Sequence, residues 1–321
     1  MKIVIIGGGG MVGQKLARHL AADGLNGSPV ELTLVDMGFP PWENGPNQIT
    51  GDVSNPAIAT KIASLRPDIV FYLAAIVSGE AEVDFDKGYR VNVHATWGVL
   101  EALRASHLAD PSYRPRVVFT SSIAVFGPPY PDQIGDTFLT APQTSYGAQK
   151  VMGEALVTDY ARKGFIEGIS LRLPTICVRP GKANMAASSF FSGIIREPLN
   201  GQEARLPVPD TVRHWHASPR AAVGFLAKAA TLDLSLLGSR PVLNLPGVSC
   251  TVAEQIEALR SVAGEEAVAR IKPDPDEAVM KIVQGWPRNF APERALAMGF
   301  RAEPDFETII RTYIEDDMPQ I

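Results

Sequence analysis

The sequence is poor in cysteine, in net positive charge and in long apolar runs, and each scarcity excludes a class of protein. Two cysteines, Cys177 and Cys250, are too few for a disulfide framework or a four-thiolate zinc site. No run approaches the roughly 20 apolar residues that span a bilayer, and the apolar start at residues 3–6 is too short for a signal-peptide core. A net charge of −5 argues against a nucleic-acid partner. We therefore expect a cytoplasmic protein with no membrane, nucleic-acid or metal partner.

The first two-thirds of the chain instead alternates short apolar runs with helical periodicity. Continuous apolar runs are typical of parallel strands that are covered on both faces. The predicted strands are residues 2–6, 31–35, 69–73, 116–120, 168–173 and, further on, 242–245. Helices are predicted around residues 12–20, 88–105 and 144–163. This order predicts an α/β fold, with a Rossmann-like doubly wound parallel sheet and a smaller, discontinuous α/β substrate domain.

A glycine-rich turn from Gly7 to Gly13 follows the first predicted strand and opens a helix. Glycines there let the backbone approach a pyrophosphate, and the helix N-terminus offers free N–H donors. Asp36 ends the second predicted strand, 23 residues after Gly13, where a carboxylate accepts hydrogen bonds from an adenosine ribose. The pattern predicts a dinucleotide site, the alternative being a glycine-rich loop without a ligand. The acid with no cation beside it favours NAD over NADP.

The amino-acid composition changes at about residue 179, where Pro, Gly, Ser and Asn become frequent. We predict an NAD-binding Rossmann domain made of residues 1–178 and 212–245. The substrate domain is predicted to comprise residues 179–211 and 246–321.

Tyr146 and Lys150 form a YxxxK pair on the third predicted helix, and their i, i+4 spacing places both on one face. A free phenol has a pKa of about 10. An ammonium about 4 Å away favours the phenolate by roughly 4 kcal/mol, about three pKa units. Tyr146 is therefore predicted to take a proton from an alcohol while hydride leaves for the cofactor.

Together these motifs resemble the extended short-chain dehydrogenase/reductase family, which includes nucleotide-sugar epimerases and dehydratases. The resemblance covers the whole chain. Besides the glycine turn and the YxxxK pair, it rests on Gly51-Asp52-Val53, Leu73-Ala74-Ala75, Asn92, Thr120-Ser121-Ser122 and Arg172-Leu173-Pro174.

The resemblance implies a role for each matching residue. Ser122 would polarise the substrate oxygen, and Asn92 would support Lys150 through a water. The implied catalytic residues are Ser122, Tyr146, Lys150 and Asn92. The implied cofactor-binding residues are Gly7, Gly10, Met11, Val12, Gly13, Asp36, Asp52, Val53, Leu73, Ala74, Ala75, Asn92, Tyr146, Lys150, Pro174 and Ile176.

Departures from the family pattern bear on the substrate. Dehydratases carry Thr-Asp-Glu where this sequence has Ser122-Ile123-Ala124, so no carboxylate is there to protonate a leaving hydroxyl. Epimerases usually have a Tyr where Phe126 stands. They often have an Asn, which binds the nucleotide diphosphate, where Thr175 stands. These departures count against a nucleotide-sugar substrate.

Residues 174–182 and 188–199 instead resemble the D-erythronate dehydrogenases, family members that oxidise the C2 hydroxyl of a four-carbon sugar acid. Gly285-Trp286-Pro287 resembles an element of short-chain L-threonine dehydrogenases in which the Trp closes over the substrate. Both relatives bind a carboxylate, which a planar guanidinium suits. The expected substrate contacts are Ser122, Tyr146, Arg179, Arg213 and Trp286, with Arg220 a further candidate. For each arginine the alternative is a salt bridge.

His214 and His216 alternate, so on a strand they would share a face. A metal would need further ligands that no nearby cluster supplies. One of the two histidines is instead a candidate to contact substrate hydroxyls.

The leading prediction is NAD-dependent oxidation of the C2 hydroxyl of a D-erythronate-like sugar acid. One alternative is a nucleotide-sugar epimerase that keeps its NAD bound, and a cleft too short for a uridine diphosphate group would count against it. The other is a non-catalytic NAD-sensing protein, against which the Tyr146/Lys150 pair weighs. Helices 88–105 and 144–163 resemble those that form a four-helix bundle in family dimers, so a homodimer is expected.

Overall fold

A seven-stranded, fully parallel sheet organises the chain in the computed structural model, which describes residues 1–181 and 187–318. The strand order is β11-β7-β5-β4-β1-β2-β3. The strands are β1 (Lys2–Ile6), β2 (Glu31–Asp36), β3 (Asn47–Thr50), β4 (Ile69–Tyr72), β5 (Arg116–Ser122), β7 (Glu167–Leu173) and β11 (Val242–Asn244). Each predicted apolar run forms one of these strands. The short edge strand β3 was not predicted, because Ile49 is its one buried residue and it has no apolar run.

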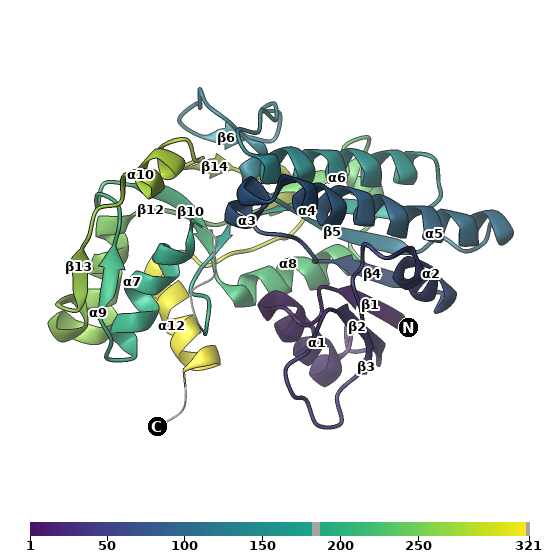
Figure 1. The fold of residues 1–321 in the computed structure, drawn as a ribbon, viewed down its shortest axis with the longest axis horizontal. Coiled ribbons are helices and arrows are strands. Elements are labelled where there is room, and N and C mark those ends of the chain that lie inside the picture. Colours follow the sequence, from purple (N-terminus) through teal and green to yellow (C-terminus); the bar gives the residue numbers. More distant parts are fainter. Residues whose placement is uncertain (182–186, 319–321) are drawn as a thin grey trace.

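Helices cover both faces of this sheet, which confirms the doubly wound fold (Figure 1). One face packs against α1 (Met11–Asp23) and α8 (Pro219–Thr231), and the other against α2 (Pro56–Ser64), α5 (Ala95–Ala109) and α6 (Ser145–Arg162). The helix predicted at 88–105 is interrupted. A short α4 (Phe85–Tyr89), preceded by α3 (Ser78–Val83), continues into α5 through a π-helical turn at Arg90–His94. Such turns are frequent at functional sites.

A smaller group of elements lies beside the sheet, on the left of Figure 1. Helices α7 (Ser189–Leu199), α9 (Val252–Val268) and α12 (Phe306–Asp317) bury a separate apolar core. Around them lie a three-stranded sheet of β8 (Thr175–Ile176), β10 (Arg213–Ala217) and β12 (Val248–Thr251), the pair β9 (Ala204–Leu206) and β13 (Ile271–Pro273), and α10 (Glu277–Gln284).

The last quarter of the chain returns to the large sheet. Ala295 of α11 (Glu293–Ala297) and Phe300 are fully buried in the core that α1 and α8 share. The guanidinium of Arg294 donates to the carbonyls of Leu237, Arg240 and Val242 beside β11. Strand β10, predicted in one domain, is hydrogen-bonded to β12, predicted in the other. The division at residues 178/179, 211/212 and 245/246 stays a prediction.

The two cysteines are free, buried thiols within the smaller core. Among the described residues, every helix is too short or too polar to cross a bilayer. Lys182, quoted above in the resemblance of residues 174–182, lies outside the described residues.

Candidate active site

One cavity of about 870 Å³ runs along the carboxyl ends of the parallel strands. It begins where β1 and β4 end side by side, and the chain leaves these two strands in opposite directions along the sheet. Ligands of open α/β sheets bind at such a switch point. The predicted site residues that line the cavity are Gly7, Gly10, Met11, Val12, Gly13, Leu73, Ala75, Ser122, Tyr146, Lys150, Pro174, Ile176, Arg179 and Trp286.

The glycine turn has the geometry that a pyrophosphate needs. Gly7 has a φ of +88°, and a Cβ on it would lie 2.6 Å from the backbone nitrogen of Ala74. A Cβ on Gly13 would lie 2.2 Å from the carbonyl oxygen of Gly7, so α1 packs against the turn only without side chains there. Gly10 precedes α1 without a capping side chain, which leaves the first N–H groups of the helix available to a ligand at the cavity wall. These residues fit a dinucleotide.

Four other predicted cofactor residues lie beside this wall without lining it. The Asp36 carboxylate accepts hydrogen bonds from the backbone N–H groups of Gly9 at 2.8 Å and Met37 at 2.7 Å. Asp52 accepts from the backbone N–H of Ser54 at 2.8 Å. The side chains of Val53 and Ala74 pack in the sheet core. Their cofactor roles stay predictions.

Ser122, Tyr146 and Lys150 meet because the start of α6 packs closely on the segment after β5. Thr144 caps α6 by accepting from the N–H of Gly147 at 3.1 Å. A Cβ on Gly147 would lie 2.2 Å from the carbonyl oxygen of Ala124, so only glycine allows this approach. The three side chains line one stretch of the cavity. Lys150 donates to the carbonyl oxygen of Thr120 at 2.8 Å, and its Nζ lies 5.6 Å from the centre of the Tyr146 ring.

Burial dominates the protonation of this pair. It raises the pKa of Tyr146 to about 12, while a hydrogen bond with Ser122 and the charge of Arg179 act in the opposite direction. Burial also lowers the pKa of Lys150 to about 8, against the charge of Glu154. Desolvation of the phenolate therefore opposes the drop in the pKa of Tyr146 that was expected from Lys150, and it outweighs the charge of Arg179.

Asn92 lies in the π-helical turn and does not line the cavity. Its Oδ1 accepts from the N–H of Ile76 at 2.8 Å, and its Nδ2 donates to Oε1 of Gln149 at 2.6 Å. Asn92 thus contacts the residue before Lys150 in α6. Sequence reasoning missed Gln149, and the support of Lys150 through a water stays a prediction.

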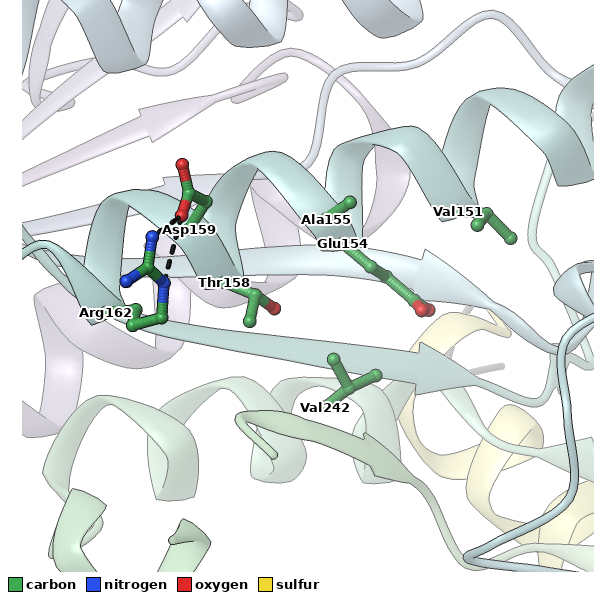
Figure 2. Close-up of a pocket in the computed structure, with 7 residues that line it drawn as sticks. All are labelled: Val151, Glu154, Ala155, Thr158, Asp159, Arg162 and Val242. Atoms are coloured by element: carbon green, nitrogen blue, oxygen red, sulfur yellow. Dashed lines mark hydrogen bonds and ion pairs between the residues drawn. The ribbon is translucent and has the colours of Figure 1, made fainter. Parts of the chain in front are cut away.

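A buried ion pair lies one helical turn beyond Lys150. Glu154 accepts from Nε and Nη2 of Arg172 at 2.8 and 2.7 Å and from the hydroxyl of Ser121 at 2.5 Å. Figure 2 shows Glu154 on α6, in a shallow pocket of about 360 Å³ that contains none of the predicted site residues. This carboxylate fixes the residue before Ser122. Sequence reasoning also missed Glu154, although its i, i+4 spacing from Lys150 was a usable signal.

The arginines predicted to bind substrate separate into two groups. Arg179 lines the cavity, where its Nη2 donates to Ser188 at 3.0 Å, and burial lowers its pKa. Arg196, which was not predicted, also lines the cavity and donates to the Arg179 carbonyl at 2.8 Å. The expectation for Arg213 is corrected. It begins β10 facing away from the cavity and pairs with Glu254 at 3.1 Å.

Arg220 is likewise engaged at the surface, where its guanidinium pairs with Asp316 and Glu315. The alternative interpretation, a salt bridge, holds for both Arg213 and Arg220.

The two histidines share one face of β10, as their alternation predicted, with ring centres 5.3 Å apart. Both are buried, and His214 lines the cavity beside Trp286, whose ring centre is 5.0 Å away. Within residues 1–181 and 187–318, no three His, Cys, Asp or Glu side chains gather as a metal site would require.

A model of the NAD-dependent epimerase/dehydratase family matches residues 3–216 of the sequence. The chain belongs to this family. It is 47% identical to a D-erythronate dehydrogenase of Cupriavidus necator over 98% of both chains. It is 42% identical to a D-erythronate dehydrogenase of Haemophilus influenzae, over 99% of this chain and all of that one. A solved structure described as a nucleoside-diphosphate-sugar epimerase from Agrobacterium tumefaciens is 55% identical, with a TM-score of 0.94 over 98% of this chain and 94% of that chain.

Membership confirms the resemblance to the extended short-chain dehydrogenase/reductases and the Rossmann-like sheet. The chain is an oxidoreductase of this NAD-dependent family and acts on a small molecule. The homodimer through helices 88–105 and 144–163 stays a prediction.

Proposed function

We propose that the chain oxidises the C2 hydroxyl of D-erythronate, or of a closely related 2-hydroxy sugar acid, with NAD⁺. The observation that carries this proposal is a cavity that Ser122, Tyr146 and the half-buried guanidinium of Arg179 line together, with the charge of Arg179 close enough to act on the Tyr146 phenol. A site for an alcohol and a site for a carboxylate thus belong to the same cavity as the glycine turn that would bind the dinucleotide. The two D-erythronate dehydrogenases that match almost the full chain support the same assignment.

Each residue has a defined task in this reaction. The glycine turn and α1 would hold the pyrophosphate of NAD, which supplies the hydride acceptor when bound. Ser122 donates a hydrogen bond to the C2 oxygen, and the phenolate of Tyr146 takes the hydroxyl proton as the C2 hydrogen leaves as hydride. The ammonium of Lys150 favours this phenolate against the effect of burial, and the positive charge of bound NAD⁺ would act in the same direction. The product is the 2-oxo acid.

The substrate end of the cavity supports a small acid. Ser122-Ile123-Ala124 offers no carboxylate for a dehydration, and the guanidinium of Arg179 suits a carboxylate. Single drug-sized ligands occupy pockets of about 300–1,000 Å³. The cavity of about 870 Å³ is within this range and extends from the glycine turn to Trp286.

The choice of NAD over NADP rests on Asp36. Its carboxylate is held at the glycine turn by the N–H groups of Gly9 and Met37, and a 2′-phosphate would meet this negative charge. We expect kcat/KM for NAD⁺ to exceed that for NADP⁺.

A direct assay tests the function. D-erythronate and NAD⁺ should yield absorbance at 340 nm with the wild-type enzyme, and Tyr146→Phe should abolish it. Tyr113→Phe is the matched control, because its hydroxyl bonds the carbonyl of Pro67 at the amino end of the sheet. It should retain full activity. Absence of turnover on every four- and five-carbon aldonate would refute the proposal.

The 55% identical structure described as an epimerase supports a second candidate, a nucleotide-sugar epimerase. That enzyme would interconvert UDP-sugars with retained cofactor and no net NADH. Chromatography of a UDP-sugar panel after incubation with the enzyme separates the two activities.

A further inference from the structure

A hydrogen-bonded chain of three groups reaches the substrate end of the cavity. Thr175 on β8 and His214 on β10 both line the cavity. The Thr175 hydroxyl oxygen lies 2.7 Å from Nε2 of His214, and Nδ1 of His214 lies 2.9 Å from the carbonyl oxygen of Pro287. The ring of His214 stacks on Phe191 at 5.3 Å and 5°, which fixes its plane.

The direction of each hydrogen bond in this chain follows from the partners. Burial lowers the pKa of His214 to about 4, so the ring is neutral at physiological pH and carries one proton. A carbonyl oxygen only accepts, so that proton is on Nδ1 and points at Pro287. Nε2 then carries only a lone pair, and the Thr175 hydroxyl donates a hydrogen bond to it.

Thr175 can therefore make a further hydrogen bond only as an acceptor. A hydroxyl whose hydrogen is already bonded to His214 has only its lone pairs available to a substrate. It can accept from a substrate hydroxyl, and it repels the oxygen of a carboxylate. The Arg179 guanidinium in the same cavity only donates. The cavity therefore has a donor side for a carboxylate and an acceptor side for a hydroxyl.

We propose that Thr175, held by His214, is a specificity-determining acceptor for a hydroxyl beyond the oxidised carbon of the substrate. This inference rests on the proposed function and deepens it. It assigns the substrate class as polyhydroxy acids and predicts slower turnover of simple 2-hydroxy acids. His214 and the Pro287 carbonyl are positioning groups, because they act on the substrate through Thr175.

Kinetics with matched acids tests the proposal. D-erythronate is compared with its 3-deoxy and 4-deoxy analogues and with (R)-2-hydroxybutanoate, which keeps the configuration at C2. The wild type should prefer D-erythronate in kcat/KM by about ten- to hundredfold over the analogue that lacks the recognised hydroxyl, since an acceptor that the bound substrate removes from water and leaves unpaired is unfavourable. Thr175→Val should lose most of this preference by slowing D-erythronate alone. Thr175→Ser, which keeps the hydroxyl, should retain it.

Two further readouts separate recognition from damage. The Kd for NADH should be unchanged in both Thr175 variants. Nitrogen-15 NMR of the imidazoles, assigned by loss of one signal in His214→Gln, should show His214 protonated at Nδ1. An equal loss by Thr175→Val on all acids, or a proton on Nε2, would overturn the inference.

Failure of the proposed function gives a different result. In that case the wild type oxidises none of these acids, and the assignment of Thr175 to a sugar-acid hydroxyl is refuted with it. Turnover by the wild type with an unchanged preference in Thr175→Val refutes the inference alone.

Discussion

Replacing Glu154 by alanine should lower the free energy of unfolding by about 3–5 kcal/mol, the usual effect of removing one partner from a buried ion pair. Its side chain is 6% exposed and that of Arg172 is 12% exposed. The change removes two charge-assisted hydrogen bonds to Arg172 and one to Ser121. The guanidinium of Arg172 is then left in the interior without its counter-charge.

The chain contains a matched control for this experiment. Glu307 on α12 also accepts from Nε and Nη2 of one arginine, Arg311, and from one serine hydroxyl, Ser261. Its side chain is 37% exposed, so water replaces the lost partners. Glu307→Ala should therefore destabilise the protein far less than Glu154→Ala.

Urea unfolding of the wild type and both variants, with similar m values, measures the difference. A double variant, Glu154→Leu with Arg172→Met, should be more stable than Glu154→Ala because it removes both buried charges together. Equal losses from Glu154→Ala and Glu307→Ala would refute the reasoning. So would a double variant that is less stable than Glu154→Ala.

Three other changes have defined outcomes. Gly13→Ala should weaken NADH binding at least tenfold, because the new Cβ would lie 2.2 Å from the carbonyl oxygen of Gly7. Nicotinamide fluorescence measures the Kd. The control variant Gly98→Ala, which has open space at its Cβ, should bind NADH normally. Burial lowers the pKa of Lys150 to about 8 from 10.5, so the folded state disfavours the ammonium. The stability of Lys150→Met relative to the wild type, measured in urea, should therefore fall by about 3 kcal/mol as pH rises from 8 to 10.5, and a relative stability that grows with pH would contradict this. Asp36→Ala should raise the ratio of kcat/KM for NADP⁺ to that for NAD⁺ about tenfold, and an unchanged ratio would show that Asp36 does not exclude the 2′-phosphate.

The sequence predicts those parts of the fold that depend on local patterns. Apolar runs identified the strands, and the glycine turn could be placed at the end of the first strand because both features lie within a few residues. The edge strand β3 was missed because an edge strand buries few side chains. The interruption of the helix at Asn92 was missed because no glycine or proline marks the π-helical turn at Arg90–His94.

The candidate site was predicted less completely, because its geometry joins distant segments. Arg179 and Arg213 were equivalent candidates in the sequence, and only the structure shows that Arg213 pairs with Glu254 while Arg179 lines the cavity. Thr175 and His214 are 39 residues apart, and no spacing rule links them. The prediction for the pKa of Tyr146 considered a charge at a fixed distance without the burial of the phenol.

The return of the chain at Ala295 and Phe300 to the core of the large sheet has a consequence for biosynthesis. The part of the sheet that would bind the dinucleotide is synthesised early. Ala295 and Phe300, which complete its core, are synthesised only when almost the whole chain has been made. A ribosome-bound chain that ends near residue 245 exposes the apolar surface that these two residues later cover. It also exposes the carbonyls that later accept hydrogen bonds from Arg294. The cofactor-binding half is therefore not a detachable module. Fusions that borrow it need the C-terminal segment as well.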